Sequence, residues 1–314
     1  MKNNRLHILF LIMILLFSFI LSIACNSCKN AGIQETTSTT YLDKDTTTIF
    51  ESQTKKEGEG ETISPDSTVE ENYNTQIQQK YSIIVSGYSY NNRHYKWFLG
   101  STGMAYKLLK NNGFIEDNIY YLFENKKEPD VDYEATKHNF EKVIEDLKKK
   151  TNPEDTLFIF LIGHGSYDGS ISYYRLNDYN LPDFEIAAMF DNLKISRLVF
   201  VFSPCNSGGF IDDLSRKNTI IITSTRKDES NRAAFIEPFL SAFDGIGDAD
   251  SNGKVSFAEA FNYASANVKE QYTINKWGKL IEHAQLDDNG DKISHEAYVP
   301  KGGDGYLAKD TYLN

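Results

Sequence analysis

Short apolar runs alternate with amphipathic stretches from residue 81 onward. The runs at 81–87, 118–123, 156–162, 198–202 and 219–223 are apolar at most positions, as in strands that are buried on both faces of a parallel sheet. The stretches between them predict helices at 104–112, 136–150 and 182–193. In the clearest of these, residues 140, 143, 144 and 147 form one apolar face. The alternation predicts an α/β fold with a mainly parallel central sheet and helices on both sides.

A long loop is expected at 166–180, after the third predicted strand. It contains Gly169 and several tyrosines. Loops of this length in compact domains are commonly binding elements.

The first 24 residues have the pattern of a secretory signal peptide. Lys2 and Arg5 precede an apolar run at 8–23, and Ala24 stands at the cleavage position. Cys25 follows as in bacterial-type lipoproteins, so we expect an exported protein that a lipid on Cys25 anchors to the outer face of the cell membrane. An uncleaved signal anchor is the alternative, because the apolar run is barely long enough to span a bilayer.

Residues 25–79 are rich in Thr, Ser, Glu and Lys and contain few large apolar side chains. Such a segment buries too little surface to offset the entropy of ordering, so we expect a disordered tether. An inhibitory pro-segment is the alternative. The predicted folded domain is 80–314, which is long enough for one substantial core.

The charge of the chain argues against a nucleic-acid partner. The formal net charge is -11, and the folded part has no stripe of Lys and Arg. We therefore expect no nucleic-acid partner.

Two neighbouring strand ends each carry a reactive side chain. His164 and Gly165 follow the run at 156–162, and Cys205 follows the run at 198–202. The carboxyl ends of parallel strands border one ligand-binding crevice, so the imidazole and the thiol are expected to meet there. Together they predict a nucleophile and its general acid and base. The backbone amides of Gly165 and Cys205 are the candidates for stabilising an oxyanion.

The remaining histidines and cysteines fit other places. His7 lies in the signal segment, His138 is on the outer side of a predicted helix, and His283 and His295 are in a polar C-terminal segment. Cys25 and Cys28 lie at the anchor. A domain cysteine that is not needed for a disulfide in an oxidising compartment indicates a reactive thiol, with an inert buried cysteine as the alternative.

The order of several motifs resembles one family. The strand at 83–87, the Asn-x-Arg-His turn at 91–94, the helix at 105–113, His164-Gly165, Cys205 and Glu229-Ser230 follow one another as in the legumain-like branch of the caspase-type cysteine peptidases. The chain is similar to a prokaryotic lipoprotein-type member with an EF-hand-like loop. The resemblance implies a caspase-like three-layer fold.

The resemblance also implies site roles. His164 and Cys205 would form the dyad, and Asn91 would support it. Arg93 and His94 would line the pocket for the residue before the scissile bond, with Arg93 binding the side-chain carbonyl of Asn or Asp. Glu229 and Ser230 would belong to the specificity loop. Legumains have Glu after the catalytic Cys, where this chain has Asn206, so a preference for Arg or Lys stays open.

Residues 248–259 match the EF-hand pattern. The oxygen ligands fall in order on Asp248, Asp250, Asn252, the backbone of Lys254, Ser256 and Glu259, with Gly253 at position 6. We expect a structural Ca²⁺ here and no cofactor for catalysis. Residues 287–291 are also acidic, but Lys292 occupies the glycine slot, which leaves a second metal and a solvated turn as equal alternatives. Similar segments, followed by an Asp-Gly-x-Leu-Ala stretch as at 304–308, occur in prokaryotic relatives of legumain.

The chain is thus predicted to be an exported cysteine endopeptidase that acts on peptide or protein substrates through an acyl-enzyme on Cys205. A transpeptidase or ligase of the same fold is one alternative, because an amine can capture the same intermediate. A catalytically inactive calcium-binding surface lipoprotein is the other.

Overall fold

The computed structural model describes residues 78–230, 234–296 and 303–314. All of these lie in one compact unit, Glu71–Asn314. The predicted signal peptide, Cys25 and all but the last two residues of the predicted tether lie outside the described residues. Within the described part of the chain, no helix combines the length and the apolarity that a membrane crossing requires.

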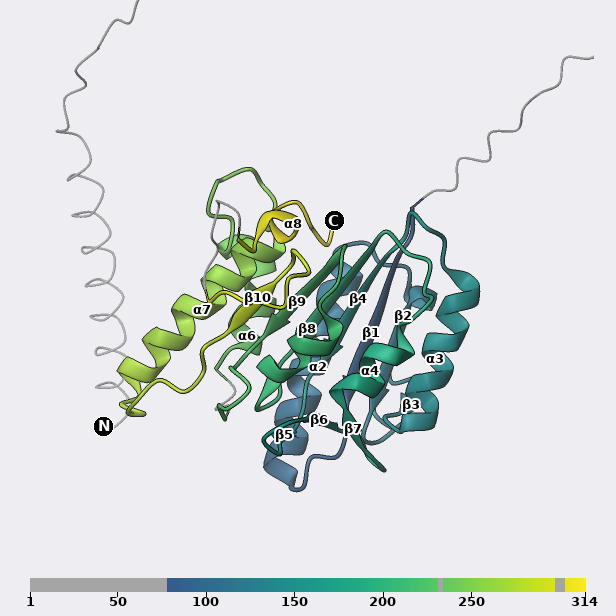
Figure 1. Ribbon diagram of the computed structural model, residues 1–314, viewed down its shortest axis with the longest axis horizontal. Coiled ribbons are helices and arrows are strands. Elements are labelled where there is room, and N and C mark those ends of the chain that lie inside the picture. Colours follow the sequence, from purple (N-terminus) through teal and green to yellow (C-terminus); the bar gives the residue numbers. More distant parts are fainter. Residues whose placement is uncertain (1–77, 231–233, 297–302) are drawn as a thin grey trace, which may run out of the picture. The chain divides into compact units, whose positions relative to one another are not determined.

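A seven-stranded sheet forms the centre of the unit (Figure 1). In spatial order its strands are β10 (Gln285–Asp287), β9 (Thr219–Thr223), β8 (Arg197–Phe202), β4 (Thr156–Leu161), β1 (Lys80–Ser86), β2 (Ile119–Phe123) and β3 (Tyr133–Glu134). The pairs are parallel except for β10 with β9. The five predicted strands are present to within a residue or two, because their apolar runs can be buried only between two layers of helices.

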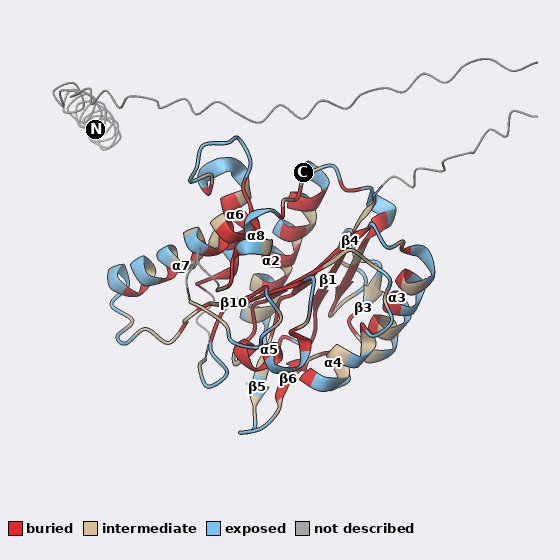
Figure 2. Cartoon of the chain, turned by 45° about the horizontal axis from the view of Figure 1, so that its top comes forward, coloured by how far each residue is buried: buried red, intermediate tan, exposed pale blue. Residues whose placement is uncertain are grey.

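Helices cover both faces of this sheet, and the burial colours separate the sheet interior from the outer helix faces (Figure 2). One face carries α2 (Asn92–Asn111), α6 (Ile236–Ser241) and α7 (Phe257–Ile274). The other carries α3 (Lys137–Lys150), α4 (Asp183–Met189) and α5 (Ile211–Leu214). Along β4, Phe158 and Phe160 point to the first face and Ile159 and Leu161 to the second, so each strand contributes to both cores. The predicted three-layer α/β fold is confirmed.

Helix boundaries differ from the prediction in two places. Helix α2 begins at Asn92, well before residue 104, because the Asn91 side chain accepts hydrogen bonds from the first-turn amides. Its buried stripe includes Ser101 and Thr102, which is why apolar spacing alone missed its first half. Helix α4 ends at Met189 and not at 193, and Asn192 has a positive φ of 61° that a continuing helix does not allow.

The expected loop at 166–180 is a second, antiparallel sheet. Its strands are β5 (Gly165–Tyr167), β6 (Ser172–Arg175) and β7 (Asn180–Pro182). They lie beyond the carboxyl ends of the main strands (Figure 1). The fully buried Tyr174 hydroxyl donates to the carbonyls of Val85 and Ile162, which joins this small sheet to the ends of β1 and β4. Strands of three or four residues are too short to show an alternating pattern in the sequence.

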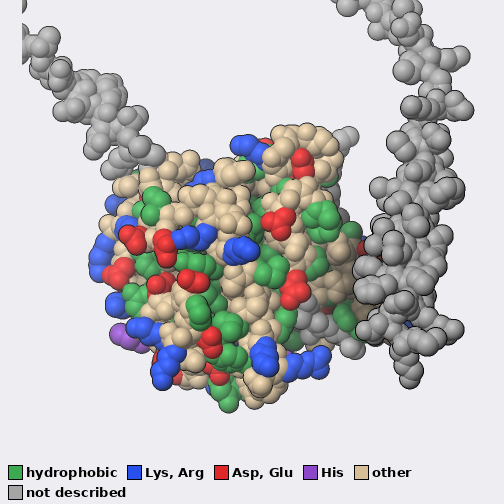
Figure 3. All heavy atoms as spheres, turned by 180° about the vertical axis from the view of Figure 1, so that it is seen from behind, with side chains coloured by type: hydrophobic (Ala, Val, Ile, Leu, Met, Phe, Trp, Pro, Cys, Tyr) green, Lys and Arg blue, Asp and Glu red, His purple; other side chains and the backbone are tan. Residues whose placement is uncertain are grey.

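The molecular surface carries both charge signs. On the face shown in Figure 3, acidic and basic side chains are interspersed among apolar and neutral ones. Several charged side chains of the described residues are paired, as in Lys149 with Asp146 at 3.5 Å. Exposed pairs of this kind contribute little to stability, typically about 0–1 kcal/mol.

Candidate active site

The parallel register of β4 and β8 positions the two candidate side chains. Leu161 at the end of β4 is paired with Phe202 at the end of β8. His164 and Cys205 each follow three residues later, so both emerge at the same level of the sheet edge. The chain continues from β1 to β2 on one side and later returns to β4 on the other. This reversal of strand order next to β4 is where open α/β sheets bind ligands.

The two turns are in direct contact. A Cβ atom on Gly165 would lie 2.4 Å from the carbonyl oxygen of Cys205 and 2.9 Å from the Cβ of Pro204. Only glycine fits this approach. The residue after the histidine thus sets how closely the two strand ends come together.

Hydrogen bonds determine which ring nitrogen of His164 is basic. Its Nε2 atom lies 3.4 Å from the carbonyl oxygen of Ser89 and 3.1 Å from Nδ1 of His94. A carbonyl can only accept, so Nε2 carries the proton. The Nδ1 atom of the neutral His164 ring is then the proton acceptor.

Asn91 supports this arrangement from the start of α2. Its Oδ1 atom accepts from the amides of Arg93 and His94, both at 3.0 Å. Its Nδ2 atom lies 3.1 Å from Nδ1 of His94, and an amide nitrogen donates. Asn91 therefore orients His94, and His94 contacts His164. No local pattern in the sequence indicates that His94 contacts the His164 imidazole.

Burial lowers the pKa of His164 below its ordinary value, and the nearby His94 lowers it further, whereas the Ser89 carbonyl opposes the shift. Tyr90 and Phe98 contact the ring, with centroids 4.9 Å and 5.0 Å away. A lowered pKa keeps the imidazole neutral, and thus able to accept a proton, at mildly acidic pH.

A buried network holds the turn that follows Cys205. The Ser207 amide donates to Oγ1 of Thr225, and the Thr225 amide donates to Oγ of Ser207. The Ser224 hydroxyl donates to the carbonyl of Pro204. These bonds tie the turn to the segment after β9 on both sides of the cysteine, so the thiol is presented from a rigid backbone.

The strand pairing leaves the Gly165 amide available. The Arg175 amide donates to the His164 carbonyl at 2.9 Å, which makes Gly165 and Tyr174 a pair that does not exchange hydrogen bonds. The Gly165 N–H is therefore not used in the ladder between β5 and β6. It fits the role of a donor to a developing oxyanion.

Asn206 is bound to the segment predicted as the specificity loop. Its amide donates to the Glu229 carbonyl at 2.8 Å, and its Nδ2 donates to the Lys227 carbonyl at 2.9 Å. Its backbone has a positive φ of 59°, which asparagine tolerates better than most residues. The hydroxyl of Ser172 donates to its carbonyl. The side chain therefore braces the loop through main-chain oxygens.

The Glu229 carboxylate is turned toward His283. Oε1 lies 2.5 Å from the His283 Nδ1 atom, and Oε2 accepts from the amides of His283 and Arg226. Glu229 thus anchors the loop, and the predicted polar segment at 283 supplies its partner. Ser230 is exposed, and so is Arg93 at the start of α2.

The EF-hand-like loop brings its acidic side chains together. One carboxylate oxygen each of Asp248, Asp250 and Glu259 lie within 4.8 Å of one another. Gly253 has a φ of +84°, the left-handed conformation that this position of the loop requires. Ser256 caps α7 and forms a capping box with Glu259. The residues present therefore fit a divalent cation with oxygen ligands.

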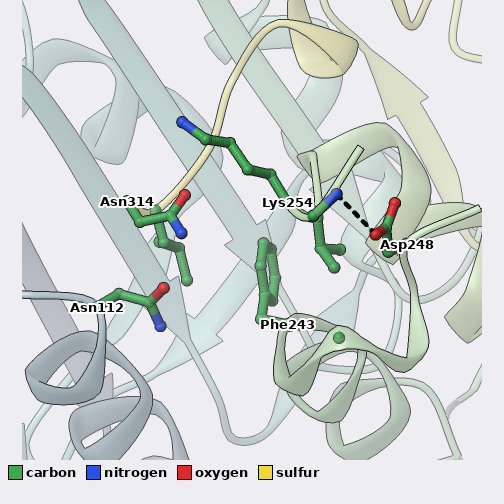
Figure 4. Close-up of a pocket in the computed structure, with 9 residues that line it drawn as sticks. Asn112, Phe243, Asp248, Lys254 and Asn314 are labelled. Carbon is green, nitrogen blue, oxygen red and sulfur yellow. Dashed lines mark hydrogen bonds between the residues drawn. The ribbon is translucent and has the colours of Figure 1, made fainter. Parts of the chain in front are cut away.

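A cavity of about 210 Å³ adjoins this loop. Asn112, Phe243, Leu313 and Asn314 line it together with residues of the loop (Figure 4). The Lys254 side chain runs away from the Asp248 carboxylate (Figure 4). The lysine ammonium group therefore does not neutralise the three carboxylates.

Comparison with known proteins identifies the class. Residues 124–296 match the peptidase C13 family, which covers more than half of the chain. The chain belongs to this family, the legumain-like cysteine peptidases of the caspase-type clan. No curated protein matches the chain significantly.

The environment of His164 predicts the pH dependence of peptidase activity. Its lowered pKa should place the acidic limb of kcat/KM below the ordinary histidine value of 6.5. In His94→Asn, less burial and no neighbouring imidazole should raise the His164 pKa, so the acidic limb should move to higher pH. Rates on a fluorogenic peptide between pH 4 and pH 8 measure this. His138→Asn, on the exposed side of α3, is the control and should leave the acidic limb in place. An acidic limb that does not move in His94→Asn would contradict the role of His94 in lowering the His164 pKa.

Proposed function

We propose that the protein is a cysteine endopeptidase in which Cys205 is the nucleophile and His164 the general acid and base. The observation that supports this most directly is the β4–β8 register with the Gly165–Cys205 contact, because it brings the two turns to one point of the sheet edge. Membership of the C13 family supports the same class of reaction.

In the proposed mechanism, Nδ1 of His164 takes the thiol proton and the thiolate attacks the carbonyl carbon of the scissile bond. The Gly165 and Cys205 amides hold the oxyanion. The protonated imidazole then gives its proton to the leaving amine, and a thioester to Cys205 remains. Water, deprotonated by the same Nδ1, attacks the thioester and releases the acid and the thiol.

For specificity we propose a pocket bordered by Arg93, His94 and the loop that Asn206 holds. The Arg93 guanidinium suits the side-chain oxygen of Asn or Asp at the position before the cut. Glu229 and Ser230 contribute through the loop backbone. The Glu229 carboxylate is engaged by His283, which leaves recognition to the main chain there.

Replacing the proposed nucleophile tests the function. In Cys205→Ala, cleavage of a peptide library varied at the position before the cut should fall by at least about 10³-fold, since the variant lacks the proposed nucleophile. Mass spectrometry of the cleavage products measures the loss of activity. The products of the wild type also show which residue is preferred before the cut. Circular dichroism and calcium uptake should match the wild type.

Two arms of this experiment separate the alternatives. An added amine competes with water for the thioester, so a transfer product identifies a transpeptidase. A peptidyl electrophile should label Cys205 faster than it labels a free thiol in solution. Cleavage that persists in Cys205→Ala, or the absence of both cleavage and selective labelling in the wild type, would refute the proposal.

We further propose that the protein is exported and lipid-anchored through Cys25. The support is in the sequence alone, in the charged residues Lys2 and Arg5, the apolar run and Ala24-Cys25. Mass spectrometry of the mature N-terminus should find an acylated Cys25, and Cys25→Ala should move the protein from the membrane fraction to the soluble fraction. A mature chain that begins elsewhere would contradict this.

The loop at 248–259 is proposed to bind a structural Ca²⁺ through Asp248, Asp250, Asn252, the Lys254 carbonyl, Ser256 and Glu259. Glu259→Gln removes one charge from the cluster, so calcium affinity at this loop should fall by about tenfold or more. Titration calorimetry measures it. Asp244→Asn, just before the loop, is the matched control because Asp244 is outside the pattern. Equal affinities in the two variants would exclude Glu259 as a ligand.

A further inference from the structure

Three carboxylates from β10, the turn after it and the C-terminal segment lie close together at the edge of the sheet. Asp287 ends β10, Asp291 lies in the turn after it, and Asp304 lies in the C-terminal segment. One oxygen of each lies within 4.8 Å of the others. Asp287 and Asp304 are both fully buried. Buried carboxylates in such a group repel one another unless a positive charge lies between them.

Hydrogen bonds account for all but one of the buried oxygens. Oδ1 of Asp304 accepts from the Asp288 amide, and Oδ2 lies 2.6 Å from Nδ1 of His295. Oδ1 of Asp287 accepts from the Gly290 amide at 3.2 Å. Oδ2 of Asp287 is buried and has no hydrogen-bond partner among the described residues. A buried carboxylate oxygen in this state calls for a partner such as an ordered water or a bound cation.

The adjacent Asp288 shows how the same turn satisfies a carboxylate without a metal. Its Oδ1 accepts from the Gly305 amide at 2.8 Å and its Oδ2 from the Ala308 amide at 2.7 Å. Asp288 thus secures the C-terminal segment against the turn and brings Asp304 to Asp287. Of the other three carboxylates, exposed Asp291 accepts from the Ile293 amide and the Asn289 side chain, and Asp304 contacts His295. Only Asp287 keeps a buried oxygen without a partner among the described residues.

We propose that Asp287, Asp291 and Asp304 bind a second Ca²⁺. All three donors are hard carboxylate oxygens, which suit Ca²⁺ better than a transition metal. The site does not follow the EF-hand spacing, because Lys292 stands in the glycine slot. Its third carboxylate comes instead from Asp304, which lies beyond the turn in sequence.

The position of this site connects it to the cysteine turn. Gln285, also in β10, packs its side-chain oxygen against Gly208, where a Cβ atom would lie 2.4 Å from it. Gly208 follows Cys205 by three residues. A cation at Asp287 therefore stabilises β10, whose Gln285 packs against the turn after the proposed nucleophile. This consequence for activity rests on the proposed function, but cation binding itself does not.

Binding is tested in the full-length chain in detergent, with Glu259→Gln present throughout so that the EF-hand-like loop contributes little. Equilibrium dialysis against ⁴⁵Ca²⁺ should find one ion per chain. At free Ca²⁺ about a hundredfold above Kd, the melting temperature should rise by roughly 5–10 °C. Adding Asp287→Asn should abolish both the ion and the rise.

The control is Asp310→Asn, which removes the same charge from an exposed position of the C-terminal segment. It should keep both the bound Ca²⁺ and the rise in melting temperature. In EDTA, Asp287→Asn should melt at or above its parent, because it removes an uncompensated buried charge. This result separates loss of the metal from failure to fold. A parent chain that binds no Ca²⁺, or an ion that Asp287→Asn leaves in place, would overturn the site. Either outcome leaves the Cys205 assay unaffected.

Discussion

The parallel pairing of β4 with β8 is the constraint on which the candidate active site depends. Both strands are buried on both faces, so a slip by one residue would exchange the side chains of two packed cores. The register is therefore strongly specified. It makes the turns after Leu161 and Phe202 start at the same level, and the absence of a side chain at Gly165 allows them to touch.

Main-chain groups then do most of the positioning around this contact. The Ser89 carbonyl determines the tautomer of His164, and the carbonyls of Lys227 and Glu229 hold Asn206. These main-chain groups are already ordered by the strands and turns that carry them, so bonds to them give a rigid site. The small sheet of β5, β6 and β7 contributes in the same way, since Tyr174 binds two strand-end carbonyls.

The strands and α3 were predictable because their apolar runs and the Thr136 cap are local signals. The start of α2 was not, since its buried stripe includes Ser101 and Thr102, whose polarity hides the period. The sequence predicts a loop at 166–180 because three strands of three or four residues are too short to show alternation. His164 and Cys205 could be chosen from sequence, whereas the contacts of His94 and His283 could not.

The sequence by itself determined the strands, the order of the motifs and the two residues that end adjacent strands, because hydrophobic periodicity and small-residue turns are properties of neighbours along the chain. Only the tertiary structure decided which nitrogen of His164 is basic, that Glu229 is held by His283, and that Asp304 joins Asp287 and Asp291. Each of these depends on groups that are brought together by folding from separate segments, and no local pattern encodes their distance or their burial.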